Sequence, residues 1–198
     1  MTSAAKPVGV GFRDRLLDGL AHSIRERGFH DTTIADIVRF AHTSRRTFYG
    51  EFTSKEACFL ALLRTTNDVV ARRIAAAVDP SASLRTQVRQ AIETYLDSLA
   101  SAPEITLSWI RELPALGTIA RDLQREMQES MVELTMRLSA AAGIEPVSRQ
   151  VAILLLGGLR ELVAVTVEDG TEVHQVSEVA IDSTLALLGL RDSAVTER

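Results

Sequence analysis

The sequence predicts an all-α protein of about nine helices. Apolar residues recur at spacings of three and four along most of the 198-residue chain, which places them on one face of successive helices. The 11 glycines and 5 prolines leave little room for the turns of a sheet, and no alternating pattern of comparable length indicates a strand. The content of apolar (46%) and charged (24%) residues is typical of a folded globular protein.

The first two helices are predicted from an apolar stripe and a capping signal. The stripe ends at Gly28, and its members recur every three to five residues: Phe12, Leu16, Leu17, Leu20 and Ile24. Thr33 with Asp36 forms an approximate capping box, with Asp in the usual Glu position, for a second helix that ends near Ala41.

A third, short helix follows a break at "AHTS", where Ser44 is suited to cap it. Phe48 and Phe52 are four residues apart and share its inner face. Thr53 with Glu56 forms a Thr-x-x-Glu capping box for a long fourth helix that runs towards Val78.

Proline, glycine and "DPSAS" at 79–83 divide the rest of the chain. The expected helices cover residues 84–102, a short segment 104–113 between Pro103 and Pro114, residues 119–142, and the final ranges 147–169 and 171–189. By composition and pattern we expect a flexible arm (1–11), a first domain (12–58) and a second helical domain (59–198).

The charge is unevenly distributed along this acidic chain of net charge −4. Residues 1–73 hold 12 Lys/Arg against 8 Asp/Glu (+4), and residues 74–198 hold 10 against 18 (−8). A mildly basic front on an acidic body suits the approach of one end to a polyanion, although chance gives such asymmetry too.

Several classes of protein are disfavoured. The apolar run Val151–Val167 is shorter than the roughly 20 residues that cross a bilayer and is interrupted by Arg160 and Glu161, so we expect a buried helix and no membrane contact. The single Cys58 and the absence of a signal-peptide pattern indicate a cytoplasmic protein. The four scattered histidines form no metal site, and no catalytic or cofactor-binding motif is present, so we expect no enzyme.

The third helix has two different faces. Phe48 and Phe52 point to one side, whereas Arg46 and Gly50 lie opposite them, flanked by Thr47 and Tyr49, with Arg45 at the edge. A basic second helix after a tight turn is the helix-turn-helix geometry that enters a DNA major groove, and the alternative is an ordinary solvated face. Thr43, Ser44 and Lys55 are suited to bind phosphates.

The order and spacing of several landmarks resemble the N-terminal domain of TetR-family transcriptional regulators. From Arg13 to about Leu63 these are "RGF", "TTIADIVRFA", "TSRRTFY" and "SKEA". The resemblance implies a three-helix DNA-binding domain followed by a helical domain for ligand binding and dimerisation. It implies DNA contacts from Thr33, Thr43, Ser44, Arg45, Arg46, Thr47, Tyr49, Gly50 and Lys55. His42 departs from the glycine common in the turn, and Glu51 from a frequent histidine or tyrosine.

In the second domain the resemblance implies a ligand cavity and a homodimer interface. Aromatic and methionine side chains are the expected cavity residues: Tyr95, Trp109, Met127 and Met131, each with ordinary core packing as its alternative. Arg160 needs a partner inside its apolar run, either across the interface or on an anionic ligand. The last two helices are expected to dimerise through Gly157, Leu162, Val165, Val176, Ala180 and Leu187, the alternative being a core within one chain.

These observations predict a homodimeric, ligand-responsive regulator, a repressor, that binds a palindromic operator in double-stranded DNA. A small hydrophobic effector is expected to release it. The alternative is a helical ligand-binding or adaptor protein that has lost specific DNA binding, which only His42 and Glu51 favour.

Overall fold

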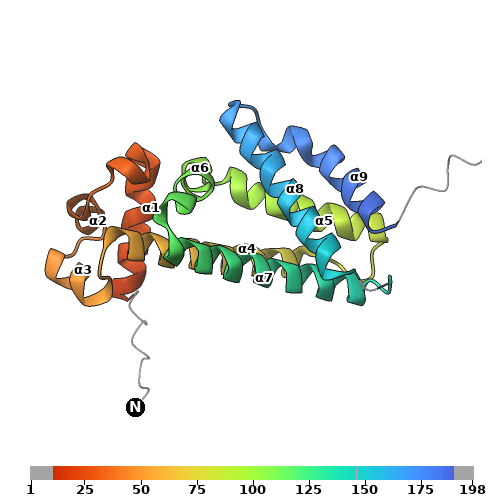
Figure 1. Ribbon diagram of the computed structural model, residues 1–198, viewed down its shortest axis with the longest axis horizontal. Coiled ribbons are helices and arrows are strands. Elements are labelled where there is room, and N and C mark those ends of the chain that lie inside the picture. Colours follow the sequence, from red (N-terminus) through yellow and green to blue (C-terminus); the bar gives the residue numbers. More distant parts are fainter. Residues whose placement is uncertain (1–10, 146, 190–198) are drawn as a thin grey trace, which may run out of the picture. The chain divides into compact units, whose positions relative to one another are not determined.

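The computed structural model describes residues 11–145 and 147–189, and these ranges contain nine α-helices, two short 3-10 helices and no strand (Figure 1). The all-α prediction is confirmed. The predicted arm, residues 1–11, lies outside the described residues except for Gly11. Two compact units divide the chain between Leu63 and Arg64, inside the long helix α4 (Lys55–Ala77).

The first unit contains α1 (Phe12–Asp31), α2 (Ile34–Phe40), α3 (Arg45–Glu51) and the start of α4. Gly28 interrupts α1 with a φ of 77°, so the predicted stop is a break after which one more turn follows. The side chains that are fully buried here come from all four helices: Leu16, Leu20, Ile24, Ile37, Phe48 and Phe59. Burial of these large apolar groups supplies most of the free energy that holds the short helices together.

The cap of α4 differs from the prediction. Ser54, not Thr53, caps this helix, because the Ser54 hydroxyl accepts a hydrogen bond from the N–H of Ala57 at 3.1 Å. Thr53 and Ser54 are adjacent and both carry a hydroxyl group, so both fit the capping pattern. The path of the backbone after Phe52 places Ser54 immediately before the helix.

The second unit continues α4 and adds α5 (Leu84–Ala100), α6 (Pro103–Arg111), α7 (Thr118–Ala141), α8 (Arg149–Glu168) and α9 (Ser177–Leu187). The 3-10 helices are η1 (Leu113–Leu116) and η2 (Val173–Val176). The last predicted helix, 171–189, is therefore shorter than expected, since its first turns are a loop and η2. The main apolar core of the second unit joins α5, α8 and α9 through residues such as Leu96, Leu159, Val163 and Ile181.

Ion pairs fasten the helices of this unit to one another. Arg89 of α5 contacts Glu178 of α9 at 2.6 Å, and Arg85 contacts Asp182 at 2.8 Å. Arg149 of α8 pairs with Glu129 of α7. Figure 1 shows α9 beside α5, where the first two pairs lie.

α8 is long and apolar enough to cross a membrane by length and composition alone, a test that core helices of soluble proteins also pass. In this structure it packs against α6, α7 and α9. One of its faces contributes Leu155, Leu159 and Val163 to the core, whereas Leu154 and Val165 are exposed, so within this chain the predicted buried helix is buried on one side only.

Candidate nucleic-acid interface and ligand cavity

The start of α2 is held by a reciprocal capping box. The Thr33 hydroxyl accepts from the N–H of Asp36 at 3.2 Å, and the Asp36 carboxylate accepts from the N–H of Thr33 at 3.1 Å. The hydrogen bond from the Thr33 hydroxyl, the largest cause, lowers the pKa of the Asp36 carboxyl. The predicted capping by Thr33 and Asp36 is confirmed, and Thr33 itself remains exposed.

The turn between α2 and α3 closes through His42, which has a φ of 48°. The N–H of His42 donates to the carbonyl of Arg39 at 3.2 Å, and the N–H of Thr43 donates to the carbonyl of Val38 at 3.0 Å. This pair of hydrogen bonds is a Schellman motif, which ends a helix with one residue in the left-handed region. Histidine therefore occupies the position that glycine normally fills, and the turn keeps its shape.

Two aromatic side chains anchor α3 to the first unit. Phe48 is fully buried and Phe52 is 5% exposed, as the helical spacing predicted. The Phe48 ring lies 5.8 Å from that of Phe52, and the guanidinium of Arg13 lies over the Phe52 ring at 4.6 Å. The Ser44 hydroxyl caps the helix by accepting from the N–H of Thr47 at 3.1 Å.

The opposite face of α3 is exposed. Arg45, Arg46 and Gly50 are all exposed, and the side chain of Tyr49 is 59% exposed. Within the described residues, Arg45 and Arg46 form no ion pair, and no atom lies within 4 Å of the position that a Cβ would take at Gly50. A helix with two free guanidinium groups and an open backbone at Gly50 can approach the edges of bases and phosphates closely.

Lys55 has a structural role that the sequence did not reveal. Its ammonium donates to the carbonyls of Phe29 (2.9 Å), His30 (3.1 Å) and Thr32 (2.8 Å), and it lies over the Phe29 ring. These bonds join the first turn of α4 to the end of α1. The predicted contact between Lys55 and a DNA phosphate stays a prediction.

Gly19 allows the close packing of α1 on α2, although no sequence motif indicated this role. A Cβ at this position would lie 2.6 Å from the carbonyl oxygen of Ile37 and 3.0 Å from the nitrogen of Ala41. Such distances require backbone atoms to move, so glycine allows α1 to pack directly on α2. A glycine inside an otherwise regular amphipathic helix was the available signal.

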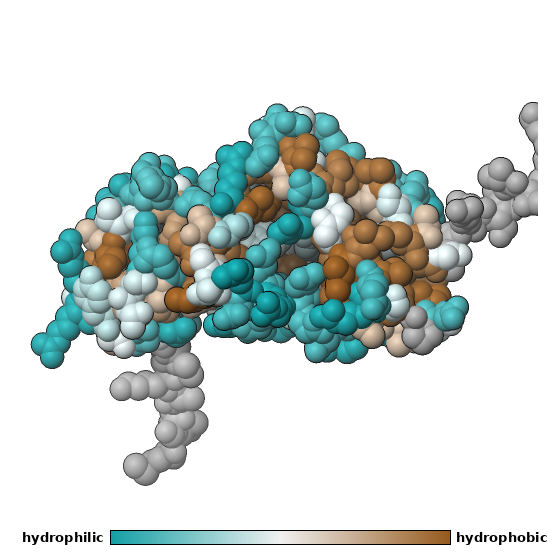
Figure 2. Space-filling view, viewed as in Figure 1, coloured by the Kyte–Doolittle hydropathy of each residue, from teal (hydrophilic) through white to brown (hydrophobic). Residues whose placement is uncertain are grey.

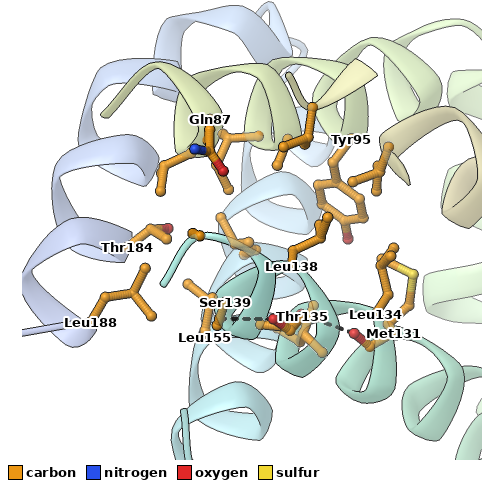
Figure 3. Close-up of a pocket in the computed structure, with 18 of the residues that line it drawn as sticks. Gln87, Tyr95, Met131, Leu134, Thr135, Leu138, Ser139, Leu155, Thr184 and Leu188 are labelled. Atoms are coloured by element: carbon orange, nitrogen blue, oxygen red, sulfur yellow. Dashed lines mark hydrogen bonds between the residues drawn. The ribbon is translucent and has the colours of Figure 1, made fainter. Parts of the chain in front are cut away.

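The second unit holds a cavity between α4, α5, α7, α8 and α9, with about 740 Å³ of space not filled by protein atoms, its open mouth included (Figure 3). Fifteen of its twenty lining residues are apolar, among them Ile74, Val88, Leu134, Leu138 and Leu155. The five polar ones are Gln87, Tyr95, Thr135, Ser139 and Thr184.

Two of the predicted cavity residues, Tyr95 and Met131, line this cavity, and Trp109, Met127 and Arg160 are not in its wall. Met127 is buried in the core, and Trp109 packs against the cluster of α5, α8 and α9. Burial raises the pKa of Tyr95 to about 12, and the positive charge of Arg160 opposes this rise.

The predicted dimer residues lie on different faces of α8, η2 and α9. Gly157, Val165 and Leu187 are exposed, Leu162 and Val176 are partly buried, and Ala180 is buried inside the unit. Two further apolar side chains of α8 and α9 are exposed, namely Leu154 (61% exposed) and Val179 (54%). Figure 2 shows apolar side chains gathered over α8 and α9 on the face in view.

No group of three or more His, Cys, Asp or Glu side chains within the described ranges is placed to hold a metal ion. Cys58 is fully buried, and burial raises the pKa of its thiol to about 12. The thiol is therefore protonated at neutral pH, which makes it a core residue and not a reactive one.

Comparisons with known proteins agree with this arrangement. The model of a family described as bacterial regulatory proteins, tetR family, matches residues 16–62, the segment that contains α2, the turn and α3. A relative from Bacillus subtilis (strain 168), named as the uncharacterized HTH-type transcriptional regulator YdgC, is 30% identical over 131 residues. The match covers 64% of this chain and 67% of that protein.

Solved structures share the fold at low sequence identity. The fatty acid degradation regulator FadR from Bacillus halodurans superposes with a TM-score of 0.72 at 17% identity, covering 99% of this chain and 100% of that one. The transcriptional regulator FadR from Bacillus subtilis, solved in complex with stearoyl-CoA, gives 0.73 at 17% identity over 90% and 98% of the two chains. A tetR-family regulator from Streptomyces coelicolor gives 0.75 at 15% identity over 90% and 81%.

The family match covers the helix-turn-helix, the curated relative extends well beyond it, and the structural neighbours share the fold. The chain belongs to the TetR family of bacterial transcriptional regulators.

Proposed function

We propose that the protein is a ligand-responsive repressor that binds a palindromic operator as a homodimer. The outward face of α3 carries this proposal, because Arg46, Tyr49 and Gly50 are exposed on a helix anchored by Phe48. Arg46 is suited to bond guanine O6 and N7 in the major groove, and Thr47 to contact a thymine methyl. The phosphate backbone on either side of the major groove would be contacted by Tyr49, Ser44, Thr43, Thr33 and Arg45.

The cavity of the second unit is the proposed effector site. Its apolar wall suits a hydrophobic molecule, and a protein of the same fold has been solved in complex with stearoyl-CoA. Because DNA is cytoplasmic in bacteria, we infer that the protein works there.

A continuous helix connects the proposed effector site to the DNA-binding unit along the chain. Ile74 of α4 lines the cavity, and Lys55, in the first turn of the same helix, is bonded to the end of α1. An effector that displaces Ile74 would shift α4, and with it the recognition helix of each protomer. The distance between the two recognition helices would then no longer match the operator, and DNA would be released.

Dimerisation is proposed through the exposed faces of α8 and α9. Leu154, Gly157 and Val165 recur at helical spacing on α8, and Val179 and Leu187 lie on α9. Two copies related by a two-fold axis would cover this apolar surface with the same residues on each side.

The test is binding of the protein to the DNA upstream of its own gene, measured by fluorescence anisotropy at a fixed salt concentration. Replacement of Arg46 by Ala is expected to weaken specific binding by about 1–3 kcal/mol and to relax discrimination at one base pair of each half-site. Arg125→Ala is the matched control, since Arg125 is an exposed arginine of α7 in the second unit. Equal affinities for the Arg46 variant and the unmodified protein would reject the recognition-helix assignment and favour a protein that no longer reads DNA.

A further inference from the structure

The few polar groups of the cavity wall present mainly hydrogen-bond acceptors. The hydroxyls of Thr135, Ser139 and Thr184 each donate to the carbonyl four residues earlier in their own helix, at 2.9, 2.8 and 2.7 Å (the first two drawn in Figure 3). A hydroxyl has one hydrogen to donate and two lone pairs to accept with. The hydrogens are therefore used inside the protein, and the lone pairs remain available to a ligand.

Gln87 presents an acceptor for the same reason. Its amide nitrogen donates to the carbonyls of Ala82 at 2.9 Å and Pro80 at 3.4 Å. These two bonds fix which end of the amide is nitrogen, because an oxygen there would face two carbonyl oxygens. Figure 3 shows the oxygen of Gln87 directed into the cavity, and in the described part of the chain it accepts no hydrogen bond although the residue is only 8% exposed.

Three of the four acceptor residues lie at one end of the cavity, and Thr135 lies between the two ends. Gln87, Ser139 and Thr184 lie at the same end as Leu188, whereas Tyr95 and Met131 lie at the other end (Figure 3). From Leu84 to Tyr95 the wall follows α5 for twelve residues, which corresponds to a rise of roughly 16 Å. The space is thus elongated, with acceptors at one end and the Tyr95 hydroxyl at the other.

No described residue of the wall carries a charge. A carboxylate placed beside Gln87, Ser139 and Thr184 would meet oxygen lone pairs and no donor, and a buried charge without a partner costs several kcal/mol. Arg160 of α8 is not part of the wall either.

We propose that the cavity binds an uncharged, elongated, mostly hydrocarbon molecule that carries a hydrogen-bond donor, a hydroxyl or a neutral N–H, at the end that meets Gln87, Ser139 and Thr184. This ligand class rests on the proposed role of the cavity as the effector site. At the end that meets Gln87, Ser139 and Thr184, the proposal excludes a carboxylate head group.

Four probes with the same hydrocarbon chain test the proposal on the full-length protein without DNA: 1-decanol, decyl methyl ether, decanoate and decylammonium, compared at pH 8. Binding is followed by isothermal calorimetry and by the fluorescence of Trp109, the only tryptophan, which packs against the same core cluster as Leu155 and Leu159. We expect 1-decanol to bind about tenfold more tightly than the ether, because the ether leaves the buried acceptors unpaired. Both ions are expected to bind at least about tenfold more weakly than the alcohol.

A double variant tests whether the preference for the alcohol over the ether depends on Ser139 and Thr184. Ser139→Ala with Thr184→Val removes two acceptors with little change in shape, and it is expected to reduce the preference for the alcohol over the ether at least about threefold while ether binding stays the same. Thr166→Val is the matched control, since Thr166 is a buried threonine whose hydroxyl makes the same bond to Leu162 at 2.7 Å but does not line the cavity.

Tighter binding of decanoate or decylammonium than of 1-decanol would overturn the proposal, as would equal binding of alcohol and ether or failure of all four probes to bind. The role of the cavity in regulation is tested separately, by adding 1-decanol to the complex with DNA. Binding of the alcohol without release of DNA would contradict the effector mechanism and leave the ligand class supported.

Discussion

His42 holds the helix-turn-helix turn in a conformation that costs a non-glycine residue free energy. With a φ of 48°, its Cβ crowds the backbone, and the left-handed region costs an L-residue about 1–2 kcal/mol. The Schellman hydrogen bonds keep the residue there. Since glycine has more conformational entropy to lose on folding, by about 0.5–1 kcal/mol, part of the gain from removing the side chain is cancelled.

We therefore expect His42→Gly to raise the free energy of unfolding by about 0.5–1 kcal/mol. This change in the free energy of unfolding is measured by urea unfolding followed by circular dichroism. Arg25→Gly, at an exposed site within α1, is the control and is expected to lower the same quantity by about 1 kcal/mol. A loss of stability in the His42 variant would show that the histidine side chain itself supports the turn.

Cys58 gives a second prediction at this scale, concerning pH. Burial raises the pKa of its thiol from 9.0 to about 12, so the folded protein holds the proton more tightly than the unfolded chain does. The stability that follows from this shift is complete below pH 9 and is lost as the pH rises towards 12.

A thiol reagent is expected to modify native Cys58 much more slowly than the urea-unfolded chain at pH 8, and urea midpoints should fall between pH 9 and 11. Cys58→Ala, which has no thiol to titrate, is the comparison for the pH series. Rapid modification of the native protein would mean that the first unit opens readily.

Residues whose role is local could be predicted from the sequence, and residues whose role depends on distant partners could not. The capping box of Thr33 and Asp36 and the position of Phe48 on the inner face of α3 follow from spacing within one helix, and both predictions are confirmed. Lys55 contacts carbonyls about 25 positions earlier, which no helical spacing indicates. Likewise, Tyr95 and Met131 line the cavity, but its polar wall comes from Gln87, Ser139 and Thr184, whose positions depend on how three helices pack.

At the scale of elements, the close contact of α1 with α2 depends on the missing side chain of Gly19. Alanine is the better helix former by about 1 kcal/mol, but its Cβ would lie 2.6 Å from a backbone oxygen of α2. Backbone atoms yield less readily than side chains, so overpacking is expected to exceed the gain in helix propensity.

Gly19→Ala is expected to lower the free energy of unfolding by about 1–2 kcal/mol, measured by urea unfolding. Gly50→Ala in α3 is the matched control, because no atom lies within 4 Å of its added Cβ, and it should raise stability by up to about 1 kcal/mol. Unchanged or increased stability of the Gly19 variant would show that α2 can move away from α1 at little cost.

The ends of the elements were predicted less well than their existence. α5 and α7 begin and end close to the proline and glycine signals around them. α9 begins at Ser177 and not at residue 171, because the preceding residues form a loop and the 3-10 helix η2. Val173 of η2 is buried in the core that α5 and α8 form, so tertiary packing determines the structure of this segment.

At the scale of the whole molecule, the net charge of −4 is unevenly divided between the two units. Residues 1–63, where α3 exposes Arg45 and Arg46, hold 9 Lys/Arg against 7 Asp/Glu (+2), and residues 64–198, which hold the cavity, have 13 against 19 (−6). Many acidic side chains of that part are used in ion pairs between helices, such as Glu178 with Arg89 and Glu126 with Arg64.

The last prediction concerns the proposed dimer. Leu154 is 61% exposed in the middle of an apolar helix, and in a two-fold dimer each substitution would be present twice. We expect Leu154→Asp to raise the dimer dissociation constant at least about tenfold, as measured by size-exclusion chromatography with light scattering, because a carboxylate would be buried without a partner.

Ile119→Asp is the control for this variant, since Ile119 is 67% exposed but lies on α7, away from the proposed interface. A dimer that survives Leu154→Asp and dissociates with Ile119→Asp would place the interface on α7. If Leu154→Asp yields a folded monomer, its affinity for a single half-site should equal that of the unmodified protein. Its affinity for the full palindrome should fall, because the second recognition helix is no longer linked to the first.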